Sequence, residues 1–167
     1  MTTDFLGFLH LHSAHDHSGS GGTDHTGGLP ENLIVATKSK DLLKGKKGFT
    51  NTFKFRRNSH SRLDDYDVIT NFRRSDSIDA RGVRKTLMID GGVPCTNLRK
   101  LSAKLIAQEC LTEKTFAANS VGAFTVDGMN GTFVVLNDDR PGFQKKSDAV
   151  VFLEGFSLSS KNSIHVI

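Results

Sequence analysis

A set of side chains in this chain of 167 residues carries oxygen atoms that could coordinate a metal ion. The candidate ligands are Asp41, Asp64, Asp65, Asp67, Asp76, Asp79, Asn137, Asp138 and Asp139. Calcium is a hard cation that takes roughly six to eight oxygen ligands, with carboxylates prominent among them. Residues 64–79 contain the densest group of carboxylates and form the best ligand set. A solvated acidic loop is the alternative interpretation of this segment.

A nine-residue period in residues 27–55 indicates how such ligands would be positioned. Cut into nines, the segment reads GGLPENLIV, ATKSKDLLK and GKKGFTNTF, and KF follows. Position six is Asn32 in the first unit and Asp41 in the second, and position eight is aliphatic. The third unit slips by one residue, which gives Asn51 the equivalent role. This pattern is typical of a parallel β-roll, in which nonapeptide repeats wind short strands joined by calcium-binding turns.

Lysines weaken the expected calcium chemistry of these repeats. Only the first unit keeps a two-glycine turn, Gly27-Gly28, which lets the backbone coil back on itself. The lysines are Lys38, Lys40, Lys44, Lys46 and Lys47. An ammonium group offers no oxygen ligand and repels a cation. The segment therefore predicts a degenerate β-roll, with chance periodicity in a lysine-rich loop as the alternative.

Positive charge is concentrated in one part of the chain. The net charge is +4 and the pI is about 9.2. Residues 38–62, which begin with Lys38 and end with Arg62, contain nine lysines and arginines and a single acidic residue, Asp41. Such a patch could bind anionic polysaccharide, lipid or nucleic acid. The alternative is a solvated basic face, because no aromatic platform or known nucleic-acid module accompanies the patch.

The N-terminal segment, residues 1–26, is rich in His, Gly and Ser and is expected to be flexible. Its histidines are His10, His12, His15, His17 and His25. Imidazoles at this density bind transition metals to some degree, but nothing in the spacing fixes a defined site. The chain has no apolar run of the roughly 18 residues that a membrane helix needs, and no signal-peptide pattern. Export would therefore need another route.

Hydrophobic patterning predicts a mainly β chain with one helix. The expected strands lie at 52–55, 66–72, 86–90, 123–126, 132–136 and 149–154, and a short apolar segment ends the chain at 164–167. DGMNG joins two of them as a hairpin connection with an Asn-Gly step. Residues 97–114 carry an apolar stripe at helical spacing and predict an amphipathic helix. The expected organisation is a flexible segment at 1–26, a degenerate β-roll at 27–61 and a β-rich C-terminal domain at 62–167.

The two cysteines do not form a disulfide framework or a metal-binding motif. Cys95 and Cys110 lie fifteen residues apart, without a CxxC motif. We expect both to be small buried hydrophobic residues. The alternative, a single disulfide between them, is geometrically possible but cannot be deduced from their spacing.

Two C-terminal segments resemble a known family. They are DYDVITNFRRSDSIDARGV at 65–83 and TFVVLNDDRPGFQKKSDAVVFLEGFS at 132–157. They are similar to the C-terminal part of cyanobacterial RTX-type (repeats-in-toxin) surface proteins, the bluetail domain group. The resemblance covers residues 62–167 and extends at lower specificity over residues 27–55, where the repeats are degenerate.

The resemblance implies a non-enzymatic, calcium-binding module of hemolysin type. Such a module would be secreted or held at the cell surface, and type I secretion machinery would export it through an uncleaved C-terminal region. Ca²⁺ is thus the implied cofactor. The chain departs from the family pattern at Asn32, Asn51 and Asn71, where the family has Asp, and only Asp41 retains a repeat carboxylate. Any remaining calcium sites are therefore expected in the acidic segments that follow the repeats.

A polar loop also contains residue types that could form a catalytic triad. Ser59, His60 and Ser61 precede Asp64 and Asp65 by a few residues. No nucleophile elbow or oxyanion motif surrounds them, and polar loops produce such trios by chance. The sequence therefore predicts no enzymatic activity.

Overall fold

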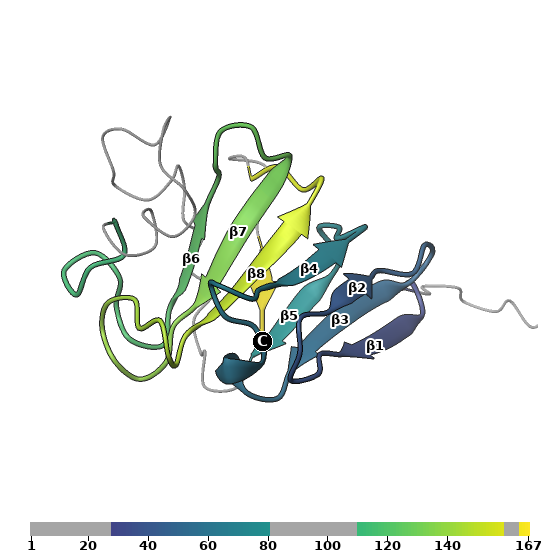
Figure 1. The fold of residues 1–167 in the computed structure, drawn as a ribbon. Coiled ribbons are helices and arrows are strands. Elements are labelled where there is room, and N and C mark those ends of the chain that lie inside the picture. Colours follow the sequence, from purple (N-terminus) through teal and green to yellow (C-terminus); the bar gives the residue numbers. More distant parts are fainter. Residues whose placement is uncertain (1–27, 81–109, 159–163) are drawn as a thin grey trace, which may run out of the picture.

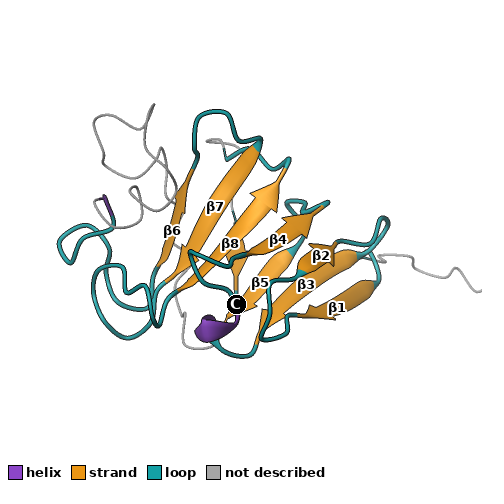
Figure 2. Ribbon diagram, in the orientation of Figure 1, coloured by secondary structure: helices purple, strands orange, loops and turns teal. Residues whose placement is uncertain are grey.

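The structure, a computed structural model, describes residues 28–80, 110–158 and 164–167 of the chain. Within these residues, nine β-strands form two sheets, and helical structure is almost absent (Figures 1 and 2). The expected mainly β class is confirmed at this level. Among the described residues there is no helix with the length and hydrophobicity of a membrane span.

The first sheet contains four parallel strands. In spatial order they are β1 (Glu31–Val35), β3 (Thr50–Phe55), β5 (Ser77–Ala80) and β9 (His165–Val166). Each strand pairs in parallel with the next one in this order. Parallel neighbours require long connections, so the chain must leave this sheet and return to it between successive strands.

The second sheet contains five strands and mixes both directions of pairing. In spatial order they are β2 (Leu42–Lys44), β4 (Asp67–Thr70), β8 (Ala149–Glu154), β7 (Gly131–Leu136) and β6 (Val121–Phe124). The first three are parallel, whereas β7 runs antiparallel to both β8 and β6. From β1 to β5 the chain therefore alternates between the two sheets, one strand at a time.

Facing sides of the two sheets form the larger hydrophobic core. Ile34, Phe53 and Ile78 are register partners across the first sheet. Phe53 and Ile78 are fully buried with Ile69 and Leu153 of the second sheet. Full burial of one such side chain contributes about 1.5–3 kcal/mol. The apolar residue two positions after each Asn or Asp in the nonamers (Ile34, Leu43 and Phe53) is thus the one that turns inward.

The opposite side of the second sheet carries a second core built on aromatic rings. Phe133 is fully buried, and its ring centroid lies 4.7 Å from that of Phe152 and 5.3 Å from that of Phe124. Tyr66 meets Phe133 edge-on at 5.2 Å. Leu111 belongs to the same buried cluster. β7 and β8 are buried on both sides, which accounts for their nearly continuous apolar sequences.

The expected C-terminal hairpin is confirmed, and one strand was not expected. β6 and β7 pair with Phe124 opposite Phe133, and the loop between them contains Gly128 at φ 81°. Residues 77–80 were predicted to belong to an acidic loop, but they form β5. That prediction was wrong because Ser77-Ile78-Asp79-Ala80 offers only one large apolar residue. Pairing with β3 on one side and β9 on the other decides its conformation.

The predicted amphipathic helix is not seen. Residues 97–109 lie outside the described residues, and the segment after Cys110 forms turns rather than helix. The Thr115 hydroxyl donates a hydrogen bond to the Cys110 carbonyl, and Thr112 N–H donates to Thr115 Oγ1. These local bonds compete with helical ones. The Leu111 carbonyl accepts a bond from Phe143 N–H instead of from a helical neighbour.

Cys110 is buried, as expected, and is bonded in a disulfide, the alternative that its spacing from Cys95 had left open. Cys95 is the other cysteine of the chain and lies outside the described residues. The N-terminal segment 1–26 and the strand predicted at 86–90 also lie outside them. Strands from both sides of the expected boundary between residues 61 and 62 contribute to both sheets.

Candidate functional site

Three side chains stack where the strands of the first sheet begin, and each lies two residues before an inward-facing apolar residue. By this criterion Asp76, two residues before Ile78, is a position-six residue like Asn32 and Asn51. Asn32 Nδ2 donates a hydrogen bond to Asn51 Oδ1 at 2.9 Å, and Asn51 Nδ2 donates to Asp76 Oδ1 at 3.1 Å. Asn51 and Asp76 are fully buried. We call these residues (Asn32, Asn51 and Asp76) the amide ladder. It joins three successive strands of the first sheet through side chains.

Ladder side chains also accept hydrogen bonds from the preceding turns. Asn51 Oδ1 accepts from Lys46 N–H at 2.8 Å, and Asp76 Oδ2 accepts from Arg73 N–H at 2.9 Å. Asn51 N–H donates to Asp76 Oδ1 at 2.8 Å. Short Asn and Asp side chains are well suited to satisfy turn backbone in this way. These oxygens are therefore occupied by N–H donors of the protein itself.

Asp41 and Asp67 occupy the corresponding positions at the start of the second sheet. Asp67 Oδ1 accepts from Asp41 N–H at 2.9 Å. The carboxylate of Asp41 accepts two bonds from Thr37, one from N–H and one from the hydroxyl. Ser61 Oγ accepts from Asp67 N–H and donates to the Val150 carbonyl.

Asp67 differs from the other position-six residues in its second oxygen. Its side chain is fully buried, and Oδ2 has no hydrogen-bond partner among the described residues. Burial raises the pKa of Asp67 to about 6, and the charges of Asp41 and Asp65 act in the same direction. The bond from Asp41 N–H opposes this rise. A buried carboxyl, one oxygen of which has no partner in the described part of the chain, thus lies at the first residue of β4.

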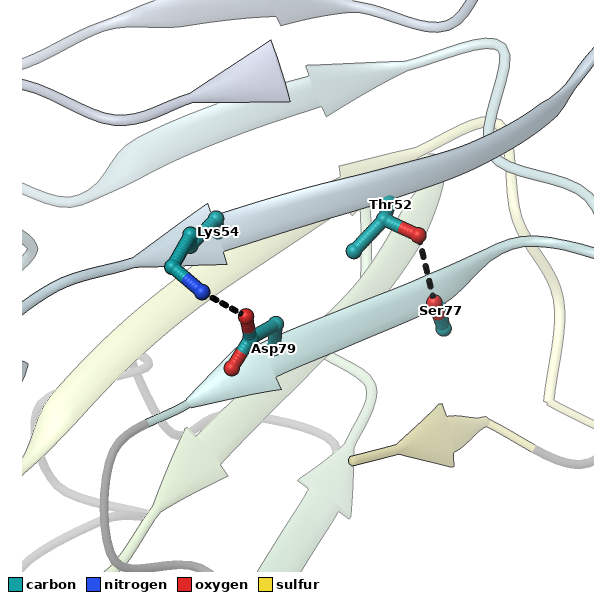
Figure 3. A network of polar contacts seen from close by, with 4 residues as sticks. All are labelled: Thr52, Lys54, Ser77 and Asp79. Carbon is teal, nitrogen blue, oxygen red and sulfur yellow. Dashed lines mark hydrogen bonds and ion pairs between the residues drawn. The ribbon is translucent and has the colours of Figure 1, made fainter. Parts of the chain in front are cut away.

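Asp79, another candidate ligand, faces away from the core and forms an ion pair. Figure 3 shows Lys54 of β3 pointing toward Asp79 of β5, with Thr52 and Ser77 alongside. Thr52 Oγ1 and Ser77 Oγ lie 3.1 Å apart. The two pairs are register partners on adjacent strands, so they tie the strands together on the solvent side. A lysine partner makes Asp79 a poor cation ligand.

Removal of the Lys54 ammonium should have only a small effect on stability. The Lys54 side chain is 41% exposed and that of Asp79 is 27% exposed, so solvent screens the pair. Lys54→Met is expected to lower the free energy of unfolding by about 0.5 kcal/mol, measured by urea denaturation. Lys44→Met, on the exposed end of β2, is the matched control. A loss of several kcal/mol specific to Lys54→Met would contradict this interpretation.

The remaining predicted ligands do not converge on one point. Asp64 Oδ2 pairs with Lys145 Nζ at 2.5 Å, and Asp65 is exposed next to it in the chain. Asn137 is buried and donates through Nδ2 to the Ala117 carbonyl at 2.8 Å. Asp138 and Asp139 lie in the loop after β7. Asp138 Oδ1 accepts from Arg140 N–H at 2.9 Å, and Asp139 is exposed.

Asp148 is a buried carboxylate that the sequence did not single out. Its two oxygens accept hydrogen bonds from Asp138 N–H at 3.0 Å and Gln144 N–H at 2.7 Å. Burial raises the pKa of Asp148 to about 6, against the effect of these two bonds. Asp148 thus accepts hydrogen bonds from backbone N–H groups of the loop before β8, just as Asp76 accepts one from the turn before β5. The signal was present in the sequence, because Asp148 directly precedes the strand predicted at 149–154.

The candidate ligands do not fit a calcium ion in the part of the chain that the structure describes. No group of three or more His, Cys, Asp or Glu side chains lies close enough there to hold a metal. Calcium needs roughly six to eight oxygens, whereas the oxygens of Asp41 and Asp76 are already bonded to N–H or O–H donors. Among the position-six carboxylates, only Asp67 has an oxygen without a partner.

A cavity of about 730 Å³ gathers basic side chains from distant parts of the chain. It is lined by Lys38, Arg57, His60, Arg62, Asp64, Asp65, Lys145 and Lys146. We call it the basic cavity. Five of its lining residues are lysines or arginines and two are aspartates, so its lining carries net positive charge. The volume lies within the usual range for small-ligand pockets.

The basic cavity contains only some of the lysines and arginines of the basic segment at residues 38–62. Lys38 and Arg62 lie in it, as the basic-patch interpretation allows, whereas Lys54 pairs with Asp79 outside it. Lys145 and Lys146 also line it, although they lie more than 80 residues away from residues 38–62 in the chain. Lys145 and Lys146 line the cavity because β8 pairs in parallel with β4. This pairing brings the loop before β8 beside the loop before β4.

The Ser, His and Asp residues of the polar loop do not form a triad. Ser61 Oγ is bonded to Asp67 N–H and to the Val150 carbonyl, so it is committed to the fold. Nδ1 of His60, at the end of the short 3₁₀ turn η1 (Asn58–His60), is buried without a partner in the described residues. A catalytic histidine would have a carboxylate or carbonyl at this nitrogen to orient the ring.

Comparison of the sequence with protein-family models and with curated proteins found no match. The resemblance to RTX-type proteins therefore rests on the residues quoted above.

Proposed function

We propose that the protein is a non-enzymatic interaction module that binds an anionic partner without a metal ion. The basic cavity carries this proposal, because it joins basic side chains from residues 38–62 with Lys145 and Lys146 in one concave surface. Grouped positive charge attracts polyanions and raises their local concentration.

The proposed architecture is a degenerate β-roll in which hydrogen bonds between polar side chains take the place of bound ions. Two features support it: strands β1 to β5 alternate between two sheets, and position-six side chains stack where each coil begins. In a calcium roll, carboxylates at these points would face the ion. Here Asn32 and Asn51 replace carboxylates, and an amide can donate as well as accept. Neighbouring coils can then bond directly to each other.

A second candidate function is a calcium-binding module of RTX type. The specific observation in its favour is Oδ2 of Asp67, which is buried, has no partner among the described residues and lies near the charges of Asp41 and Asp65. A bound cation would satisfy that oxygen and favour the ionised carboxyl. This candidate requires further oxygen ligands beyond those that the described residues bring together.

Thermal unfolding with a calcium chelator and with excess calcium separates the two candidates. The metal-free proposal predicts midpoints that agree within about 2 °C, with magnesium as the control for ionic strength. A calcium-specific rise in the midpoint that disappears in Asp67→Asn would favour the calcium-binding module and contradict the metal-free one.

We also propose that the protein works outside the cell, secreted or attached to the surface. The disulfide at Cys110 supports this location, because disulfides persist in oxidising compartments. The resemblance of residues 62–167 suggests type I secretion machinery and cell-surface components as partners. Detection of the intact protein in the medium only when that machinery is present would test the route.

A further inference from the structure

We infer that the basic cavity is a binding site for a sulfated or otherwise acidic saccharide segment rather than for a nucleic acid. The inference rests on the proposed function and specifies the ligand of the same site. It depends on which groups line the cavity, which aromatic rings are available beside it and how the acidic residues are arranged.

The cationic groups line the cavity from three separate segments. Lys38 lies in the turn before β2, Arg57 and Arg62 flank η1, and Lys146 lies in the loop before β8. These separated positive charges around the cavity suit a saccharide that carries anionic groups at intervals along its chain, because each anionic group can lie against a different lysine or arginine. Arginine adds two parallel donors that suit a sulfate or carboxylate group.

Among the described residues, no Phe or Tyr side chain lines the cavity. Proteins that bind single-stranded nucleic acid stack bases on exposed aromatic rings, and each stacked base contributes about 1–3 kcal/mol. Tyr66 directly follows Asp64 and Asp65, the two aspartates that line the cavity. Its ring packs against Phe133 and Phe152. Lys40 Nζ lies 5.3 Å from the centroid of the same ring. The tyrosine is therefore engaged by the protein and offers no free stacking platform.

Two carboxylates in the wall favour a ligand that has hydroxyl groups as well as charge. Asp64 and Asp65 line the cavity, and Asp64 pairs with Lys145. Carboxylates accept hydrogen bonds from sugar hydroxyls but repel a continuous row of phosphates. His60 of the η1 turn also lines the cavity, and its imidazole adds a polar group to the two carboxylates.

A heparin oligosaccharide and a single-stranded DNA of equal charge are suitable probes, with affinities measured by calorimetry on the full chain. Arg62→Gln with Lys146→Gln removes two cavity charges, and both side chains are exposed, so the fold should tolerate the changes. Lys44→Gln with Lys47→Gln removes the same charge from exposed positions outside the cavity. The cavity pair should weaken heparin binding about fivefold to tenfold, and the control pair less than about twofold.

The outcomes separate failure of the ligand class from failure of the function. Tighter binding of DNA than of heparin, lost in the cavity pair, would overturn the saccharide assignment and leave the proposed function intact. Equal weakening by both pairs would overturn the cavity as the site. Absence of binding to either polyanion at low salt would overturn the proposed function itself.

Discussion

Asn51→Asp is expected to lower the free energy of unfolding by about 3 kcal/mol near neutral pH. The amide nitrogen of Asn51 lies 3.1 Å from Asp76 Oδ1 and 3.2 Å from the Lys46 carbonyl, and it donates to both. An oxygen at that place would face two acceptors, and two carboxylates would meet in a fully buried environment. Urea denaturation near pH 7.5 measures the loss.

Acid should reverse much of this loss, because two facing carboxyls can share a proton. The difference between Asn51→Asp and the original protein is therefore expected to shrink toward about pH 4.5. Asn130→Asp, an exposed residue in the loop between β6 and β7, is the matched control and should change stability little. Equal stability of Asn51→Asp and the original protein near neutral pH would contradict the amide ladder.

Asn51→Leu tests the same ladder without adding charge. It removes the acceptor of Lys46 N–H and of Asn32 Nδ2, and it leaves the buried Asp76 carboxylate with fewer donors. The expected loss is about 3–5 kcal/mol at all pH values, since buried polar groups lose their partners. A pH-independent loss in this variant, beside a pH-dependent loss in Asn51→Asp, would separate hydrogen bonding from charge.

Local patterns in the sequence predicted the strands that have a strong signal of their own. β3 and β8 were predicted from alternating or continuous apolar residues, and the β6–β7 hairpin from its Asn-Gly connection. The nine-residue period also located residues that bond between adjacent strands, because Asn32 and Asn51 are bonded register partners on β1 and β3. In each case a few consecutive residues determine both the conformation and the buried side.

Features that depend on pairing between distant segments could not be predicted. β5 is a strand because β3 and β9 flank it, and its four residues carry no such signal alone. Lys145 and Lys146 lie in the basic cavity only because β8 pairs with β4. The candidate ligands were chosen by residue type, but four of them accept bonds from nearby backbone N–H groups, namely Asp41, Asp67, Asp76 and Asp138. Residue type alone does not distinguish an Asp that binds a cation from one that closes a turn.

Asp67→Asn is expected to stabilise the protein near neutral pH and to reduce the dependence of its stability on pH. Burial disfavours the charged form of Asp67 and raises its pKa from the ordinary value of 3.8 to about 6. A carboxyl with a raised folded pKa contributes stability below its unfolded pKa and loses that contribution as pH rises through 6. The shift of about two units corresponds to about 3 kcal/mol.

Asparagine preserves the one hydrogen bond that the Asp67 side chain makes, because its carbonyl oxygen can still accept from Asp41 N–H. The variant should therefore match the original protein near pH 4 and exceed its free energy of unfolding by about 2–3 kcal/mol near pH 7.5, measured by urea denaturation. Asp148→Asn is the informative comparison, since both oxygens of Asp148 accept N–H bonds and an amide can replace only one of them.

Asp148→Asn should accordingly lose stability near pH 4, where Asp67→Asn does not. A cation at Asp67 would reverse the prediction near neutral pH, because the ionised carboxyl would then be the stabilised form. Stabilisation by Asp67→Asn in chelator, with the same gain in calcium, would support a fold that polar ladders hold without a metal. A gain in chelator that turns into a loss in calcium would instead assign Oδ2 of Asp67 to an ion.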